Sequence, residues 1–143
     1  MTERLKLRFP FENSEGIGET ETLWVIKRDD GYELYNIPFY VTGLAVGDLV
    51  SARPDTDGVL WYSELIKPSG HSTIQLWIER QEDVASVRAA LRELGCDSEV
   101  SDLPRLVAVN VPRNVPYTKV QAYLEQGERS GRFEYQEACL GFQ

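Results

Sequence analysis

The sequence predicts an α+β protein, in which a small N-terminal β-barrel or sandwich packs on a C-terminal ferredoxin-like βαββαβ sandwich. Two observations lead to this fold class. Short apolar runs separated by Asp-Gly pairs fill residues 1–70, a pattern typical of β-hairpins. After residue 70 the apolar spacing changes between strand and helix periods, in the order of a split βαβ motif.

The first half contains short strands joined by turns. The run Leu23–Ile26 predicts a strand that is buried on both faces. Asp30-Gly31 predicts a tight hairpin turn after it, and Pro38 ends regular pairing because proline has no N–H to donate. The strands predicted for this half are residues 5–9, 19–27, 32–35, 49–53 and 59–66.

The second half combines strands with two amphipathic helices. Apolar residues recur every three or four positions from Val84 to Leu94, which predicts a helix near residues 82–94 with Gly95 as its C-terminal cap. Pro116 suits the first turn of a second helix, near residues 117–127, which Gly127 and Gly131 are expected to end. The strands predicted for this half are residues 72–79, 98–100, 106–111 and 133–139.

The period changes near residues 67–70, which divides the chain into a small β subdomain (residues 1–70) and an α+β subdomain (residues 71–143). No Gly/Ser-rich or Pro-rich linker separates the two parts. We therefore expect the subdomains to share an interface.

Composition favours a folded protein, and its acidity fits either solubility alone, which is the favoured interpretation, or a cationic partner. The 143 residues carry 15 Lys+Arg and 23 Asp+Glu, a formal net charge of −8, with 42% hydrophobic residues. The acidity is spread over both halves, and no run of Lys or Arg offers a phosphate-binding patch, so we expect no nucleic-acid partner. A net negative field steers association with basic surfaces.

The two cysteines, Cys96 and Cys139, form no CxxC pair and have no neighbouring histidine, which excludes a zinc knuckle. We expect both to be reduced and buried, and we predict no metal and no cofactor. The segment Met1–Lys6 has no apolar region, and no stretch of the chain approaches a membrane span of about 20 apolar residues. A cytoplasmic protein without a membrane partner is the expectation.

Four residues are candidates for a pocket between the halves: Tyr35, Asn36, Asp48 and His71. His71 is the only histidine, and histidine suits general-base chemistry near neutral pH. The alternative is structural: His71 is buried at the junction and bonded by backbone or Ser/Thr groups, Asp48 accepts backbone N–H groups in its turn, and Asn36 ties an irregular segment to a strand. We favour the structural alternative for each residue.

The tryptophans Trp24, Trp61 and Trp77 lie inside predicted strands, which favours core positions. Standard catalytic and nucleotide-binding motifs, including GxGxxG, the P-loop, HExxH and GxSxG, are absent from the sequence. The sequence therefore predicts no catalytic residues and a protein that is not an enzyme.

The segments Glu21–Val25, Tyr35–Phe39, Gly47-Asp48 and Ser69–Thr73 together resemble a family of small bacterial proteins known only as a domain of unknown function. The resemblance spans most of the chain. It implies a bacterial, cytosolic protein and supplies no activity or catalytic residues.

The leading functional hypothesis is a non-enzymatic acidic binding protein, an immunity protein that inhibits a cationic bacterial toxin domain by occlusion. The toxin step is an analogy of size and charge. The alternative is a small-molecule-binding domain or enzyme with its pocket around His71. The expected partner-binding carboxylates are Glu12, Glu15, Asp29, Asp30, Asp55, Asp57, Glu82 and Asp83.

Overall fold

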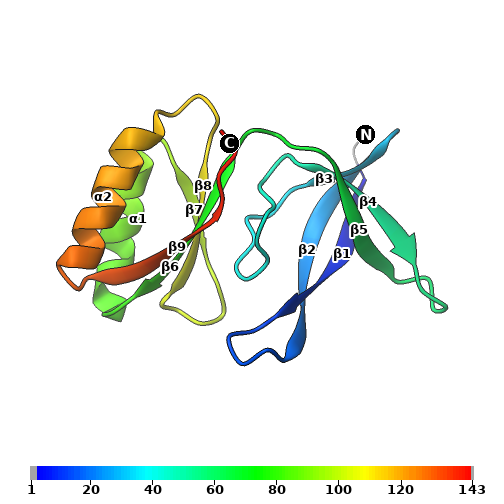
Figure 1. The fold of residues 1–143 in the computed structure, drawn as a ribbon, viewed down its shortest axis with the longest axis horizontal. Helices are drawn as coiled ribbons and strands as arrows, with labels where there is room; N and C mark the ends of the chain where they lie inside the picture. Colours follow the sequence, from blue (N-terminus) through cyan, green and yellow to red (C-terminus); the bar gives the residue numbers. More distant parts are fainter. Residues whose placement is uncertain (1–2, 143) are drawn as a thin grey trace.

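The computed structural model describes residues 3–142 and consists of a strand barrel beside a second sheet, whose far face is covered by helices (Figure 1). The first five strands are β1 (Arg4–Glu12), β2 (Gly18–Arg28), β3 (Gly31–Leu34), β4 (Leu49–Pro54) and β5 (Leu60–Lys67). The later strands are β6 (Ser72–Ile78), β7 (Asp97–Val100), β8 (Leu106–Val111) and β9 (Phe133–Cys139). The helices are η1 (Gln81–Asp83), α1 (Val84–Glu93) and α2 (Tyr117–Arg129). The α+β prediction is confirmed.

Strands β1 to β5 pair in sequence order and close into a barrel. The closure is a parallel contact at Arg8 and Trp61, between β1 and β5. Apolar side chains at alternate positions fill the inside, among them Leu7, Phe9 and Val25, each with no exposed surface. This alternation corrects the expectation for residues 23–26, because only one face of β2 is buried and Trp24 on the other face is 41% exposed.

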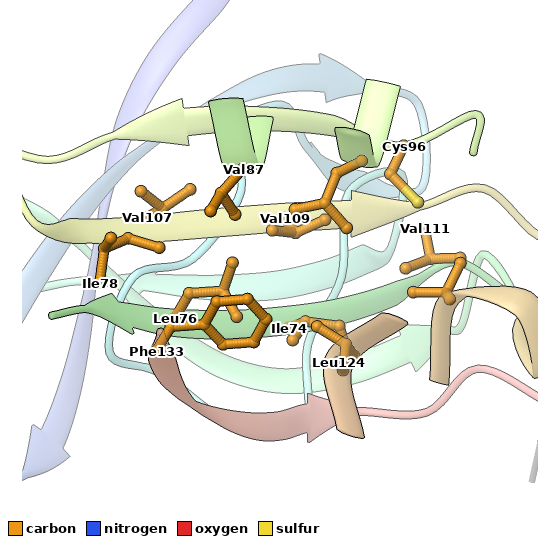
Figure 2. Packing of buried hydrophobic residues seen from close by; sticks show 12 residues of the cluster. Ile74, Leu76, Ile78, Val87, Cys96, Val107, Val109, Val111, Leu124 and Phe133 are labelled. Atoms are coloured by element: carbon orange, nitrogen blue, oxygen red, sulfur yellow. The ribbon is translucent and has the colours of Figure 1, made fainter. Parts of the chain in front are cut away.

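The second sheet has the strand order β7-β8-β6-β9. Its outer face is covered by α1 and α2, as Figure 1 shows. The core between sheet and helices combines β-branched strand residues with helix residues such as Val87 and Leu124 (Figure 2). Because β6 and β8 are the central strands, their inward side chains Ile74, Leu76 and Val109 are almost completely buried.

The inner face of this sheet is covered by the irregular segment 35–48, which lies between the sheet and the barrel in Figure 1. Two polar side chains of β6 hold this segment. Thr73 Oγ1 donates to the carbonyl of Leu44 (2.8 Å), and Gln75 Nε2 donates to the carbonyls of Pro38 and Val41 (3.3 and 3.1 Å). The loop between β3 and β4 therefore joins the halves.

Helix α2 continues past Gly127 to Arg129, so of the two glycines expected to end it only Gly131 lies beyond the helix. Gly131, with φ of 73°, supplies the left-handed position beyond the helix end. Gly127 is instead buried inside the helix. The ring of Phe133 occupies the space that a Cβ atom at this position would fill. In the described residues 3–142, no helix is long and apolar enough to cross a membrane.

Candidate functional site

Asp48 has a structural role in its turn. Its side chain is 2% exposed, and its two carboxylate oxygens accept from the backbone N–H of Ala45 (3.0 Å) and Ser69 (2.8 Å). Ser69 in turn donates its hydroxyl to the carbonyl of Val46 (2.7 Å). Both oxygens of Asp48 thus accept hydrogen bonds from the protein backbone.

Two glutamates and Asn36 fix the start of segment 35–48. Oδ1 of Asn36 accepts from the backbone N–H of Trp24 (2.8 Å), which ties the segment to β2 as the structural alternative predicted. Glu99 of β7 accepts from the backbone N–H of Ile37 (2.9 Å). Glu21 of β2 is 7% exposed and accepts from three successive backbone N–H groups, those of residues 39–41, at 2.7, 3.0 and 3.0 Å.

His71 is half-buried, and its ring contacts Asn110 of β8. Nδ1 of His71 lies 3.1 Å from Nδ2 and 3.3 Å from Oδ1 of Asn110. The ring nitrogen accepts from the amide when it is unprotonated and donates to the carbonyl oxygen when it is protonated. The Ser/Thr partner predicted for His71 is found at its backbone, where the N–H of His71 donates to the hydroxyl of Ser69 (3.2 Å). The partner of the ring is the side-chain amide of Asn110, which the sequence did not predict.

The four residues of the alternative pocket are only partly brought together. Tyr35 and Asn36 line a cavity of about 340 Å³ beside β7, and Asn110 lies in its wall. His71 reaches this cavity only through its contact with Asn110, and Asp48 does not line it. Within the described chain, no carboxylate is hydrogen-bonded to the His71 ring.

The expected partner-binding carboxylates are distributed over four places in the fold. Figure 1 places the three hairpin turns that carry most of them at separate points of the barrel. Asp55 accepts from two backbone N–H groups and from Nε1 of Trp61 (3.0 Å), so it holds its own turn together. The four groups are the β1–β2 turn (Glu12, Glu15), the β2–β3 turn (Asp29, Asp30), the β4–β5 turn (Asp55, Asp57) and η1 (Glu82, Asp83).

The pair in η1 already has cationic neighbours. Glu82 forms an ion pair with Arg80, and Asp83 lies 3.9 Å from Nε of Arg132. In the β1–β2 turn, by contrast, Glu12 lines a groove between the two sheets.

This inter-sheet groove has a volume of about 660 Å³ and is the candidate binding site. Its lining combines exposed aromatic rings with the carboxylates Glu12, Glu19 and Glu134, and includes no Lys or Arg. Phe11 and Tyr40 stack in parallel on one side, with ring centroids 5.2 Å apart. The groove residues that carry the argument are Phe11, Glu12, Glu19, Tyr40, Trp77 and Glu134.

The electrostatic environment of the groove is anionic. The pKa of Tyr40 is raised, first by burial and then by Asp102, Glu21 and Glu19. Negative charge raises a phenol pKa because it opposes formation of the phenolate. The same field favours a cation brought near the ring of Tyr40.

Trp77 forms part of the sheet side of the groove and is 38% exposed. The expectation of core positions is therefore wrong for Trp77 and Trp24, and Trp61, which is half-buried, belongs to neither core cluster. Outside the groove lining, the guanidinium of Arg105 lies 4.7 Å from the Trp77 ring centroid and donates to the carbonyl of Ile78 (2.9 Å).

Sequence reasoning missed Glu19, Tyr40, Trp77 and Glu134 as neighbours, because they come from four segments far apart in the chain. The signal available in the sequence was the two-residue alternation of strand side chains. Trp77 alternates with Leu76 and Ile78 on β6, so burial of those two residues places Trp77 on the opposite face of the sheet.

A second cavity, of about 440 Å³, lies where α2 begins and includes Arg113, Tyr117 and Glu137. Here the Tyr117 hydroxyl donates to Glu137, and burial and this bond raise the pKa of Tyr117. Among the described residues, no three His, Cys, Asp or Glu side chains are placed to hold a metal ion.

Comparison with known proteins gives a family and a fold. A family model described as "Domain of unknown function (DUF4265)" matches residues 21–135. A solved structure described as a hypothetical protein from Neisseria gonorrhoeae is similar, with a TM-score of 0.87 and 25% sequence identity. The alignment covers 99% of this chain and 98% of that one. No curated protein matches the chain.

Proposed function

This chain belongs to the family described as Domain of unknown function (DUF4265), and we propose that it is a non-enzymatic binding protein that takes a basic protein partner in the inter-sheet groove. The single observation that carries the proposal is the lining of that groove. Aromatic rings and three carboxylates surround about 660 Å³, and no Lys or Arg is part of the lining, although Arg105 contacts the Trp77 ring from outside it.

Such a lining suits an arginine or lysine side chain. A cation placed over an aromatic face gains about 0.5–2 kcal/mol, and a carboxylate within hydrogen-bond reach adds a charge-assisted bond. Tyr40 presents its ring beside Glu19, and Trp77 presents its ring beside Glu134 of the adjacent strand. The partner would insert its basic side chains between these pairs.

We further propose that the partner is a cationic toxin domain and that this chain acts as its immunity protein in the cytoplasm, inhibiting by occlusion. The formal charge of −8 supports fast association with such a partner. A standard interface buries about 800 Å² per partner. The neighbouring carboxylate Glu15 would then lie at the rim of the contact.

The arrangement of the two parts supports the binding proposal. We propose that residues 1–70 form a barrel subdomain and residues 71–143 a ferredoxin-like subdomain. The strand order β7-β8-β6-β9 with two helices on one face supports the second assignment. The groove then lies at the contact between subdomains, where binding sites commonly occur.

The test uses charge reversal in the groove. A fluorescein-labelled oligo-arginine peptide is the first probe, followed by the candidate toxin encoded beside the gene in its native host. The double variant Glu19→Lys/Glu134→Lys should weaken binding at least tenfold. The control Glu93→Lys/Glu125→Lys makes the same change in net charge on the exposed helix surface and should have little effect.

Two results would reject the proposal. Equal loss of binding in both double variants would show that net charge alone attracts the peptide and that the groove is not the site. Failure of the chain to protect cells that co-express the neighbouring toxin would reject the immunity role. That failure would not affect the conclusion drawn from peptide binding in the groove.

The second candidate function is a small-molecule site or enzyme pocket around His71. It is favoured by the contact of His71 with Asn110, whose side chain is 5% exposed and lies in the wall of the 340 Å³ cavity. Retention of a small molecule by the purified protein, lost in Asn110→Ala and kept in Glu19→Lys/Glu134→Lys, would support this candidate over the groove.

A further inference from the structure

The outer face of the barrel carries a cluster of basic side chains that is not apparent from the negative net charge of the chain. On β1 the apolar residues Leu7 and Phe9 point into the barrel. Successive strand side chains alternate between faces, so the intervening Arg4, Lys6 and Arg8 lie on the outer face, about 7 Å apart along the strand.

Aromatic side chains flank these cations on both sides. Trp24 of β2 is paired in register with Lys6. Tyr35 lies next to Trp24, because its backbone N–H donates to the Trp24 carbonyl (3.0 Å). On the other side, Trp61 of β5 is in register with Arg8 of β1 and with Arg53 of β4.

The side chains of this barrel face contact one another. Nζ of Lys6 lies 5.3 Å from the Trp24 ring centroid, and Cζ of Arg4 lies 5.3 Å from that of Tyr35. The two rings remain 41% and 48% exposed. Cations and flat rings thus alternate across β4, β5, β1 and β2 and end at Tyr35, on a surface open to solvent.

This face gathers cations although the whole chain is acidic, and Glu33, which the strand register places on the same face, is paired with Arg28. Its cations are Arg4, Lys6, Arg8 and Arg53, four of the seven basic residues in the first half of the sequence. The nearby Asp55 is bonded to its own turn and to Trp61, and its pKa is lowered by these hydrogen bonds and by Arg8. The sequence shows no run of basic residues because strand alternation spaces them two apart.

We propose that this barrel face binds single-stranded nucleic acid. Arg4, Lys6 and Arg8 would contact successive phosphates, and Trp24 and Tyr35 would stack on bases. Base–aromatic stacking is worth about 1–3 kcal/mol per base and is tolerant of sequence. The exposed rings favour a single strand over a duplex, whose base faces are covered by stacking, and over an acidic peptide, which has no such faces. This binding would depart from the expectation of no nucleic-acid partner, which was based on net charge and on the absence of a basic run. It goes beyond the proposed function and uses a different surface.

The test measures fluorescence anisotropy of a fluorescein-labelled oligo(dT) strand and of an oligo(U) strand. Because the remaining charge of the chain opposes binding, we expect dissociation constants in the range of about 10⁻⁴ to 10⁻⁶ M. Three or four phosphate contacts, at a slope of about −0.7 each, imply a loss of about 20- to 50-fold between 50 and 200 mM salt.

Matched variants locate the site. Lys6→Glu/Arg8→Glu should reduce affinity at least tenfold, whereas Arg92→Glu/Lys119→Glu, the same charge change on the exposed helix surface, should reduce it less than threefold. Trp24→Ala should weaken binding about fivefold or more, and Trp77→Ala, in the groove, should not. Circular dichroism confirms that each variant is folded.

Three results would overturn the proposal. One is the absence of binding at 50 mM salt by folded wild-type protein. Another is equal affinity for a duplex or for polyglutamate, which would assign the face to polyanions in general. The third is salt-sensitive self-association in light scattering that accounts for the anisotropy change, with a second copy of this chain as the occupant.

Discussion

The ring of Phe133 occupies the space beside Gly127 that a Cβ atom would fill. Gly127 lies inside α2, and Phe133 begins β9 with 2% of its surface exposed. A glycine inside a helix costs about 1 kcal/mol relative to alanine. Here that cost allows the helix backbone to approach the aromatic ring, which fills the core between helix and sheet.

Gly127→Ala should therefore lower the free energy of unfolding by about 1–3 kcal/mol, the usual cost of overpacking a core. The gain in helix propensity offsets only part of this loss. Urea unfolding gives the value. In a Phe133→Leu background the same substitution should cost less, since the smaller side chain leaves room; a stabilising effect in the wild-type background would contradict the packing argument.

Glu21→Gln should destabilise the chain by about 1–3 kcal/mol. The side-chain NH₂ of glutamine cannot accept from the backbone N–H groups that now donate to a carboxylate oxygen. Glu125→Gln, an exposed control, should change stability by less than about 0.5 kcal/mol. Hydrogen exchange supplies a local readout. The backbone amides of residues 39–41, which donate to Glu21, should exchange faster in the variant, and unchanged exchange would count against this role.

His71→Ala should lower the free energy of unfolding by about 0.5–1.5 kcal/mol, the net value of one hydrogen bond. A double-mutant cycle with Asn110→Ala should give a coupling energy of similar size, because each of the two substitutions removes the same contact between His71 and Asn110. Binding of the oligo-arginine peptide should stay unchanged, since His71 does not line the inter-sheet groove. Lost binding in a folded variant would reject this structural role.

Stability should fall at alkaline pH, partly through Cys96. Burial, and then the charge of Asp97, raise the pKa of the Cys96 thiol to about 11 from its ordinary 9.0. Above pH 9 the unfolded chain releases this proton while the folded chain keeps it. The folded state then binds more protons, so the free energy of unfolding decreases as pH rises from 9 toward 11.

Urea unfolding at several values between pH 8 and pH 11 checks this sign. The variant Cys96→Ala should show a shallower decline than the wild type over the upper part of that range. Tyrosines with raised pKa values, such as Tyr117, contribute in the same direction and remain in both proteins. Identical slopes would show that the Cys96 proton does not contribute.

Much of the fold was predictable because hydrophobic period is a local property. The alternation on β6 and the helical spacing from Val84 to Leu94 place strand and helix to within a few residues. Strand β9 was predicted at its observed bounds. The role of Asp48 was also readable, because an Asp in a Gly-containing turn commonly accepts nearby backbone N–H groups.

The errors have a common cause. Gly127 was expected to end α2 because a helical glycine is usually a cap, and only the contact with Phe133 explains its place inside the helix. Trp24 and Trp77 were expected in the core because of their residue type, yet each lies on the strand face opposite to the core. The type of a side chain gives only its preference for a buried position. Whether it is buried depends on which face of its strand or helix the other elements cover.

The sequence by itself determined the α+β class, the order of elements and the change of period near residue 70, since each depends on neighbours along the chain. Only the tertiary structure decided which distant residues meet. Closing the barrel put Trp61 beside Arg8, and packing segment 35–48 on the sheet put Tyr40 in one groove with Trp77. Such contacts arise from long-range pairing and packing, for which a single sequence carries no local period.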